Sequence, residues 1–237
     1  LDFRISHRFG RLNSGSYNLR GLVQSTIHFS LEYGITDWLM AGTGRGSFEK
    51  TYDGFLKLSP LRQSTGAMKM PVSVSFLSSI AVKTQKWENT EQVNYFSSRL
   101  SYVYQVMIGR KFSNSFSAQV TPSLVHRNMT ATELDPNDLY AMGLGGRIKL
   151  SARVSLNLEY YYMVKPIPDR LRTVTYNPVS VGFDIETGGH VFQLIFTNSL
   201  SMIEKGFIGE TTGRVEQGDI HFGFNISRFF TIKDYHH

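Results

Sequence analysis

The sequence has 237 residues, no cysteine, and a net charge of +6 from 25 Lys and Arg against 19 Asp and Glu. Its length suits one large all-β unit or two small domains, and the absence of cysteine excludes disulfides and thiolate metal sites. The basic residues are scattered without a basic run or a recognised binding motif, so we expect no nucleic-acid partner. No window of about 20 apolar residues exists, which excludes a membrane-spanning helix.

Apolar and polar residues alternate through most of the first half of the chain, a pattern that gives an extended strand one apolar and one polar face. Gly34 to Asp37 predicts a tight hairpin between the second and third of these runs. A longer connection is expected from Pro60 to Pro71. The predicted strands cover approximately residues 3–9, 27–33, 38–48, 52–58, 72–82 and 100–108.

The second half continues the pattern, with six more runs. Pro122 lies inside the seventh predicted strand and indicates a bulge or local distortion, because proline cannot donate to a strand ladder. Pro166 and Pro168 end the ninth. These strands cover approximately residues 116–125, 140–150, 154–162, 179–186, 192–196 and 220–228.

The links between the runs alternate in length. They are short after the second, sixth, eighth and tenth strands and long after most of the others, which is typical of outer-membrane barrels with periplasmic turns and external loops. We therefore predict a single domain, residues 1–237, that forms a twelve-stranded antiparallel transmembrane β-barrel with both termini in the periplasm. A soluble β-sandwich or β-barrel is the alternative, but many runs reach nine residues, close to the length that crosses a bilayer.

Three C-terminal segments and one N-terminal segment also carry a family resemblance. Residues 189–199, 202–213 and 218–228 resemble an uncharacterised family of outer-membrane β-barrels found in Bacteroidota, and residues 7–10 look like the first strand of that family. The resemblance implies an outer-membrane location, with membrane lipid as a partner, and a barrel fold. It implies no activity and no catalytic residues.

The polar faces of the predicted strands supply candidate residues for the barrel interior. Their charges are nearly balanced and face a narrow space, so we expect them to pair, because an unpaired buried charge is unfavourable. A network that fills the lumen is one interpretation, and a small pore with weak ion preference is another. The candidates are Arg4, Arg8, His28, Glu32, Arg99, Arg147, Lys149, Glu159, Asp184, Glu186 and His221.

Neither a metal site nor an active site is expected. His28, His190 and His221 show no ligand spacing that the sequence can verify, so we expect structural roles and no cofactor. No serine motif, Asp pair or His-Asp arrangement appears in a matching context, so we expect no enzyme. His236 and His237 are left out of functional reasoning because they resemble a tag remnant.

Three functions are compatible with these patterns. The balanced interior favours a barrel with a narrow or plugged lumen that serves as a structural or docking subunit of an envelope assembly, with other envelope proteins as partners. The alternative is a passive, porin-like channel for small solutes, and the third is a lipid-modifying barrel enzyme. Specificity is expected in the loops 83–96, 128–138, 163–178 and 199–218, because rigid barrels act through their connections.

Overall fold

Twelve antiparallel strands form a closed barrel in which β1 pairs with both β2 and β12. The computed structural model describes residues 1–66, 69–87, 95–130, 135–164 and 175–231, so His236, His237 and parts of the first three named loops lie outside the described residues. No helix in these ranges is long and apolar enough to cross a membrane. The strands are β1 (Asp2–Arg11), β2 (Ser25–Gly34), β3 (Leu39–Gly46), β4 (Thr51–Leu61), β5 (Ser73–Lys83), β6 (Leu100–Lys111), β7 (Phe116–Arg127), β8 (Asp138–Lys149), β9 (Val154–Val164), β10 (Val179–Thr187), β11 (His190–Thr197) and β12 (His221–Phe229).

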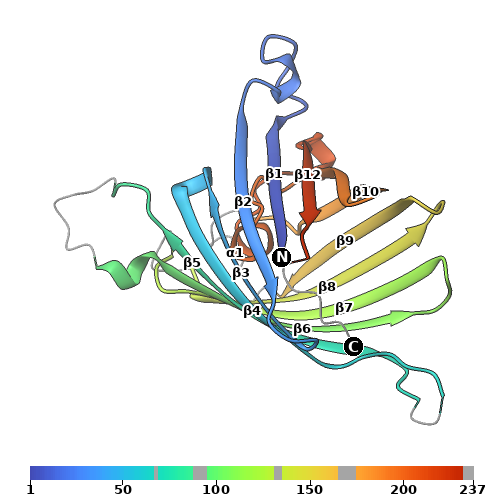
Figure 1. Cartoon of the computed structure of the whole chain (residues 1–237). Helices are drawn as coiled ribbons and strands as arrows, with labels where there is room; N and C mark the ends of the chain where they lie inside the picture. The colour runs from blue at the N-terminus through green and yellow to red at the C-terminus, as the bar shows by residue number, and fades with distance from the viewer. Residues whose placement is uncertain (67–68, 88–94, 131–134, 165–174, 232–237) are drawn as a thin grey trace.

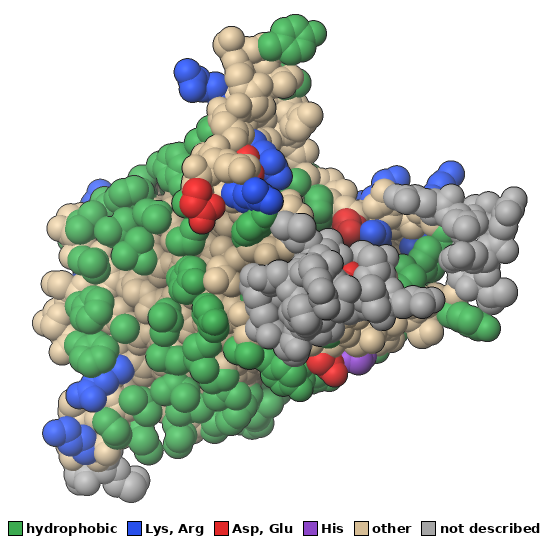
Figure 2. Space-filling view, turned by 180° about the vertical axis from the view of Figure 1, so that it is seen from behind, with side chains coloured by type: hydrophobic (Ala, Val, Ile, Leu, Met, Phe, Trp, Pro, Cys, Tyr) green, Lys and Arg blue, Asp and Glu red, His purple; other side chains and the backbone are tan. Residues whose placement is uncertain are grey.

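The outer wall of the barrel is apolar. Large side chains such as Phe29, Leu56 and Leu144 point outward and are between 43% and 53% exposed. Only eight hydrophobic side chains among the described residues are buried, whereas many serines, threonines and charged residues are. Figure 2 shows hydrophobic side chains spread over one side of the wall, with most Lys and Arg near its edges. This distribution is the reverse of a soluble sandwich and fits a wall that is solvated by lipid.

Most residues of the inner face are polar or small, as the register of the strands shows. Asp2 of β1 pairs with Glu32 of β2, which in turn pairs with Gly42 of β3. Because paired residues share a face, the glycines of β3, whose orientation is not evident from the alternation, point into the barrel. Gly42 leaves room for the ring of Phe55, since a Cβ there would lie 2.2 Å from Phe55 Cε1.

Two prolines mark irregularities in the wall. Pro60, expected to begin a connection, lies inside β4, where the register with β5 shifts between Leu58 and Leu61. Proline has no backbone N–H to donate to a neighbouring strand. It is tolerated at Pro60 because the shifted register requires no such hydrogen bond there. Pro122 pairs with Met142 of β8, but no pair to β6 forms at Pro122. The distortion predicted at Pro122 is therefore a gap in one ladder.

The two ends of the barrel differ in their connections. The turn end carries the links 35–38, 62–72, 112–115, 150–153 and 188–189, and also the start of β1 and the end of β12. The loop end carries the links 12–24, 47–50, 84–99, 128–137, 165–178 and 198–220. Figure 1 shows the first loop projecting beyond the rest of the barrel, whereas α1 (Glu204–Gly209), part of the last loop, lies among the strands.

Candidate functional site

The lumen contains two adjoining polar cavities toward the turn end. One, of about 670 Å³, is bordered by the β8–β9 and β10–β11 turns and by Arg4. The other, of about 570 Å³, is lined by inward residues of β6 to β11, including Gln119 and Asn157. Both cavities touch Arg147, Asp184 and Gln193, so they form one polar space that reaches the turn end.

Charged side chains in this space pair along the wall. Arg4 Nη1 lies 3.3 Å from Glu32 Oε1 on the neighbouring strand. Arg147 Nη2 lies 2.9 Å from Glu186 Oε1 and 3.8 Å from Asp184 Oδ2. These charged groups of the lumen thus form ion pairs with one another. The contacts of Arg147 join residues of the wall that border the two cavities.

Arg8 differs from the other lumen arginines. Its side chain is 8% exposed, and its Nη1 donates to the backbone oxygen of His7 at 3.0 Å and to Asn225 Oδ1 at 3.1 Å. No carboxylate of the described residues forms an ion pair with it, and its buried Nε has no partner there. A buried charge without an ion-pair partner is unfavourable by roughly 3–5 kcal/mol. The positive charge of Arg8 is therefore not balanced by a carboxylate within the described residues.

Four other predicted lumen residues face inward in different surroundings. His28 Nε2 lies 2.7 Å from Asp53 Oδ1, and His221 Nδ1 lies 2.8 Å from the backbone oxygen of Phe9. Glu159 is exposed to the lumen, with Ser180 Oγ at 3.5 Å from its Oε2. Lys149 faces inward opposite Ser155 near the turn end. By contrast, His190 points outward and stacks on Phe192.

Arg99 lies outside the wall of the barrel. It is the last residue of the short helix η3 (Phe96–Arg99), one residue before β6 begins. Its Nη1 donates to the backbone oxygens of Lys83 at 2.8 Å and Gln85 at 2.6 Å, and its guanidinium covers the ring of Trp87. Arg99 therefore holds the β5–β6 loop at the rim of the barrel. It does not line the lumen as predicted, because β6 begins only at the next residue, Leu100.

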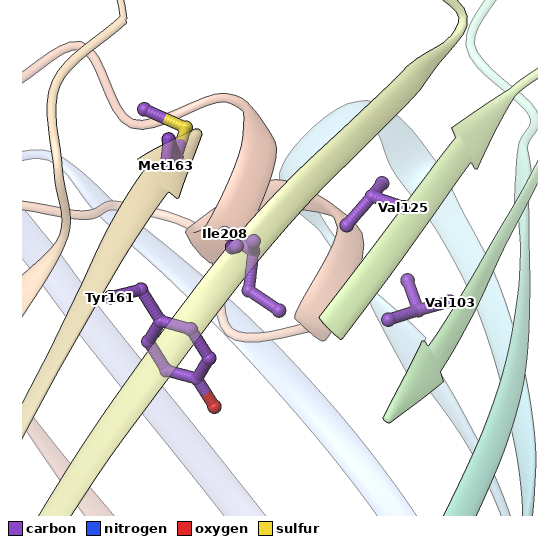
Figure 3. Close-up of a cluster of buried hydrophobic side chains, with 6 residues drawn as sticks. Val103, Val125, Tyr161, Met163 and Ile208 are labelled. Carbon is purple, nitrogen blue, oxygen red and sulfur yellow. The ribbon is translucent and has the colours of Figure 1, made fainter. Parts of the chain in front are cut away.

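The last loop inserts a plug, defined here as residues 201–211, into the loop end of the barrel. Ile208 of α1 is fully buried against inward side chains of β6, β7 and β9, and Figure 3 shows it between Val103, Val125, Tyr161 and Met163. Full burial of an isoleucine contributes about 1.5–3 kcal/mol. This apolar contact therefore holds α1 inside an otherwise polar interior.

An ionic latch fixes the plug to the opposite side of the barrel. Lys205 Nζ lies 2.9 Å from Glu49 Oε2 and 3.1 Å from Glu210 Oε1, and Lys83 Nζ lies 2.8 Å from Glu49 Oε1. Glu49 and Lys50 have φ of 51° and 49°, in the left-handed region that such residues rarely adopt. Strained backbone of this kind is concentrated at functional sites in proteins. Here it accompanies the position of the Glu49 carboxylate that pairs with Lys205.

Two carboxyl groups at the plug have pKa values shifted in opposite directions. Burial raises the pKa of Glu49, but Lys205 and Lys83 outweigh it, and the net result is a lowered pKa. Enclosure inside the barrel raises the pKa of Glu204; its own backbone N–H and His28 oppose this, whereas Asp53 adds to it. The seated plug thus favours the charged form of Glu49 and disfavours the charged form of Glu204, each in comparison with a carboxyl group in water.

The base of the plug is held by hydrogen bonds that sequence patterns could not reveal. Asn198 Nδ2 donates to the backbone oxygens of Asn177 at 3.1 Å and Gly213 at 3.0 Å. Asp219 Oδ2 lies 3.2 Å from Arg11 Nη1, and its Oδ1 accepts from Asn13 Nδ2 at 2.7 Å. These contacts anchor both ends of the last loop to the rim.

The sequence does contain one signal for the bulky lumen residues, namely inward glycines. A Cβ at Gly44 would lie 2.5 Å from His28 Cε1, at Gly143 2.5 Å from Tyr161 Cε1, and at Gly223 2.5 Å from Arg8 Cδ. Each glycine makes room for a large side chain on an adjacent strand. At these three positions, a glycine in the polar phase stands beside a large lumen residue.

Comparison with known proteins places this geometry in a family. Among solved structures, the KdgM porin aligns with a TM-score of 0.58 and 7% identity, covering 98% of this chain and 100% of that chain. The NanC porin aligns with a TM-score of 0.62 and 6% identity, covering 97% of this chain and 100% of that chain. At this identity the likeness shows the fold alone.

No protein of curated function matches the chain. The sequence does match, over residues 1–230, the family described as "Membrane bound beta barrel domain (DUF5777)". The match spans all twelve strands of the closed barrel. The chain therefore belongs to the DUF5777 family of membrane-bound β-barrel domains.

Proposed function

We propose that this protein is a porin-like channel of the outer membrane, which passes small polar solutes and is closed at rest by the plug. The observation that carries the proposal is the polar space formed by the cavities of about 670 and 570 Å³, which reaches from the turn end toward α1. Ion pairs along the wall leave this space free for water, as a solute path requires. The porin fold of the structural neighbours supports the same reading.

The proposal includes an orientation. The turns and both chain ends lie on one side of the barrel, and we place that side in the periplasm, with the plug facing outward and lipid around the wall. This assignment agrees with the usual arrangement of short and long connections in such barrels. The family resemblance of the C-terminal segments also leads us to propose an origin in Bacteroidota.

Conductance and solute uptake test the proposal together. In planar bilayers we expect the wild type to show brief openings on a closed baseline, and in liposomes a slow uptake of a neutral pentose. A variant in which a glycine-serine linker replaces residues 201–211 should remain open and take up the pentose faster. Circular dichroism would confirm that both proteins are folded.

Other outcomes separate the remaining functions. A folded protein whose baseline stays flat, with and without residues 201–211, would overturn the channel. If that protein also co-purified with another envelope protein in mild detergent, the docking role predicted from the sequence would gain support. Turnover of labelled lipid would instead support the lipid-modifying alternative.

A further inference from the structure

An apolar groove lies on the outer wall of the barrel, across β4 to β8. It has a volume of about 500 Å³, within the range of small-molecule sites. The short side chains of Ser78, Val106 and Pro122 lie within it, and the larger rings of Tyr104 and Tyr140, which are 49% and 54% exposed, border it. The groove lies where the β6–β7 ladder is interrupted at Pro122, so it is a hollow in the wall itself.

The groove faces the lipid around the barrel. Its lining includes Leu56 and Phe76, two exposed side chains of the apolar outer wall. The strands β5, β6 and β7 supply most of the lining and contain no Asp or Glu. A hydrocarbon chain gains dispersion attraction only from atoms that lie close to it, and a groove brings more atoms close than a flat wall does. An acyl chain of a membrane lipid is therefore the occupant that fits the groove.

An arginine stands on the same face of the wall toward the turn end. Arg110 is exposed and lies on the outward face of β6, four residues beyond Val106. Its guanidinium carbon lies 5.1 Å from the ring centre of Phe112, and that ring stacks on Phe116 with the centres 5.6 Å apart. These rings support the guanidinium at the end of the wall. Because β5 and β7 contain no Asp or Glu, no carboxylate on a neighbouring strand neutralises it.

The spacing between Arg110 and the groove fits within one lipid leaflet. The four residues from Val106 to Arg110 span about 14 Å of antiparallel strand, which at a tilt of about 40° is about 11 Å across the membrane. The hydrocarbon of one leaflet is about 15 Å thick. A lipid whose headgroup lies at Arg110 can therefore place part of an acyl chain in the groove.

A positive group beside an apolar groove suits a phospholipid. Guanidinium groups bind phosphate through charge-assisted hydrogen bonds that are frequently paired. We propose that this side of the wall binds one phospholipid of the leaflet at the turn end, with its phosphate at Arg110 and one acyl chain in the groove over β4 to β8. The site goes beyond the proposed channel and does not depend on conduction. A protein that holds the lipid but never conducts would keep this site and refute the channel.

Native mass spectrometry of the purified full chain measures lipid binding copy by copy. The protein in detergent would be titrated with dioleoyl phosphatidylglycerol and, separately, with dioleoylglycerol, which has the same chains and no phosphate. We expect the first copy of phosphatidylglycerol to bind at least about tenfold more tightly than the second copy, and at least about tenfold more tightly than dioleoylglycerol.

Two pairs of variants separate the two parts of the site. Arg110→Gln should weaken the first copy of phosphatidylglycerol about tenfold. Its control, Arg228→Gln, removes an arginine of β12 that also covers a phenylalanine ring but lies outside the groove, and should change binding by less than about twofold. Ser78→Leu fills part of the groove and should weaken both lipids about fivefold. Thr43→Leu, at an exposed position of β3 outside the groove, is its control.

Each contrary result overturns a defined part of the proposal. Equal affinities for successive copies of phosphatidylglycerol would show general lipid contact and overturn the site. Equal binding of the two lipids, or equal loss in Arg110→Gln and Arg228→Gln, would overturn the phosphate contact. Equal affinities in Ser78→Leu and Thr43→Leu would overturn the groove as the position of the acyl chain. Ser78→Leu also tests the site if Arg110→Gln fails to fold, which circular dichroism would show.

Discussion

The loop end and the turn end of the lumen are filled in different ways. At the loop end, Ile208 occupies an apolar pocket and Lys205 joins Glu49 and Glu210, so protein atoms occupy the space. At the turn end, Arg147 pairs along the wall with Glu186 and the centre is left to solvent. One barrel thus combines an end packed with protein atoms and an end with polar cavities, and only the packed end requires the last loop.

The largest effect is expected from a charge placed in the apolar pocket of the plug. Ile208→Asp buries an unpaired carboxylate and removes the packing of Ile208, which destabilises the seated plug by roughly 4 kcal/mol or more. Bilayer recordings should then show a persistently open channel. Val215→Asp adds the same charge at an exposed position of the same loop and should leave the recordings unchanged. If the two variants changed the bilayer recordings equally, the packing of Ile208 would not be what closes the loop end.

Removal of the latch cation should have the next largest effect. Lys205→Met keeps the length of the side chain but leaves Glu49 and Glu210 without their shared partner, which disfavours the closed state by about 2–3 kcal/mol. The open probability in bilayers should rise accordingly. Lys149→Met, at the turn end, removes a lumen charge from outside the latch and is the control. An unchanged open probability in Lys205→Met would show that the ion pairs do not hold the plug.

The opposite pKa shifts at the plug predict two limits of pH. Glu49 has a lowered pKa, so it stabilises the seated plug above its ordinary value of 4.5 and loses this effect as the pH falls through the lowered value. Glu204 has a raised pKa, so its contribution is complete below 4.5 and is lost as the pH rises through the raised value. The open probability should therefore be lowest at intermediate pH and rise on both sides.

Single substitutions separate these two limits. Glu49→Gln should weaken the latch and remove the rise in open probability at low pH, whereas Glu204→Gln should remove the rise at high pH. Recordings at a series of pH values on both sides of 4.5 follow both changes. An open probability that does not vary with pH in the wild type would contradict the assignment of Glu49 and Glu204 to the closed state.

The smallest effect concerns the wall that supports the plug. A Cβ at Gly143 would meet the buried ring of Tyr161 at 2.5 Å, so Gly143→Ala should lower the free energy of unfolding by about 1–3 kcal/mol. Gly145 lies on the same face of β8, but its nearest neighbour would be Gln119 Cβ at 3.7 Å, so Gly145→Ala should change stability by less than about 0.5 kcal/mol. Thermal unfolding in detergent measures both, and equal stabilities would contradict the close packing of Tyr161.

The wall of the barrel was predictable from sequence because its signal is local. Alternation in 220–228 is visible in neighbouring residues, and it places Phe222 and Phe224 on the outer face and Asn225 on the inner face, as the structure does. The twelve-stranded barrel is confirmed. Charges on a shared face also follow from the strand phase, which is why Arg4 and Glu32 could be assigned to one interior.

The plug was not predictable, because its contacts join distant parts of the chain. Lys205 meets Glu49 across 156 positions in sequence. α1 has only six residues, too few for a helical period, and its apolar residues look like ordinary loop content. Arg99 was assigned to the lumen by extending the polar phase one residue before the predicted strand 100–108, where the alternation no longer fixes the direction of a side chain. The inward glycines beside His28, Tyr161 and Arg8 are a local sign of the interior, because each makes room for a large side chain.

The most direct test of the closed loop end is a disulfide between the plug and the wall. The chain has no cysteine, and a Cβ at Gly209 would lie 3.8 Å from Val125 Cγ1, although the end of Leu139 must shift. Val125 Cγ1 marks a position that the sulfur of Val125→Cys can occupy, so a small shift of the plug would allow a bridge to Gly209→Cys. We expect the pair to oxidise readily in the membrane, to hold the channel closed, and to release the openings on reduction. A pair that does not form, or a locked protein that conducts like the wild type, would contradict a plug that closes the barrel.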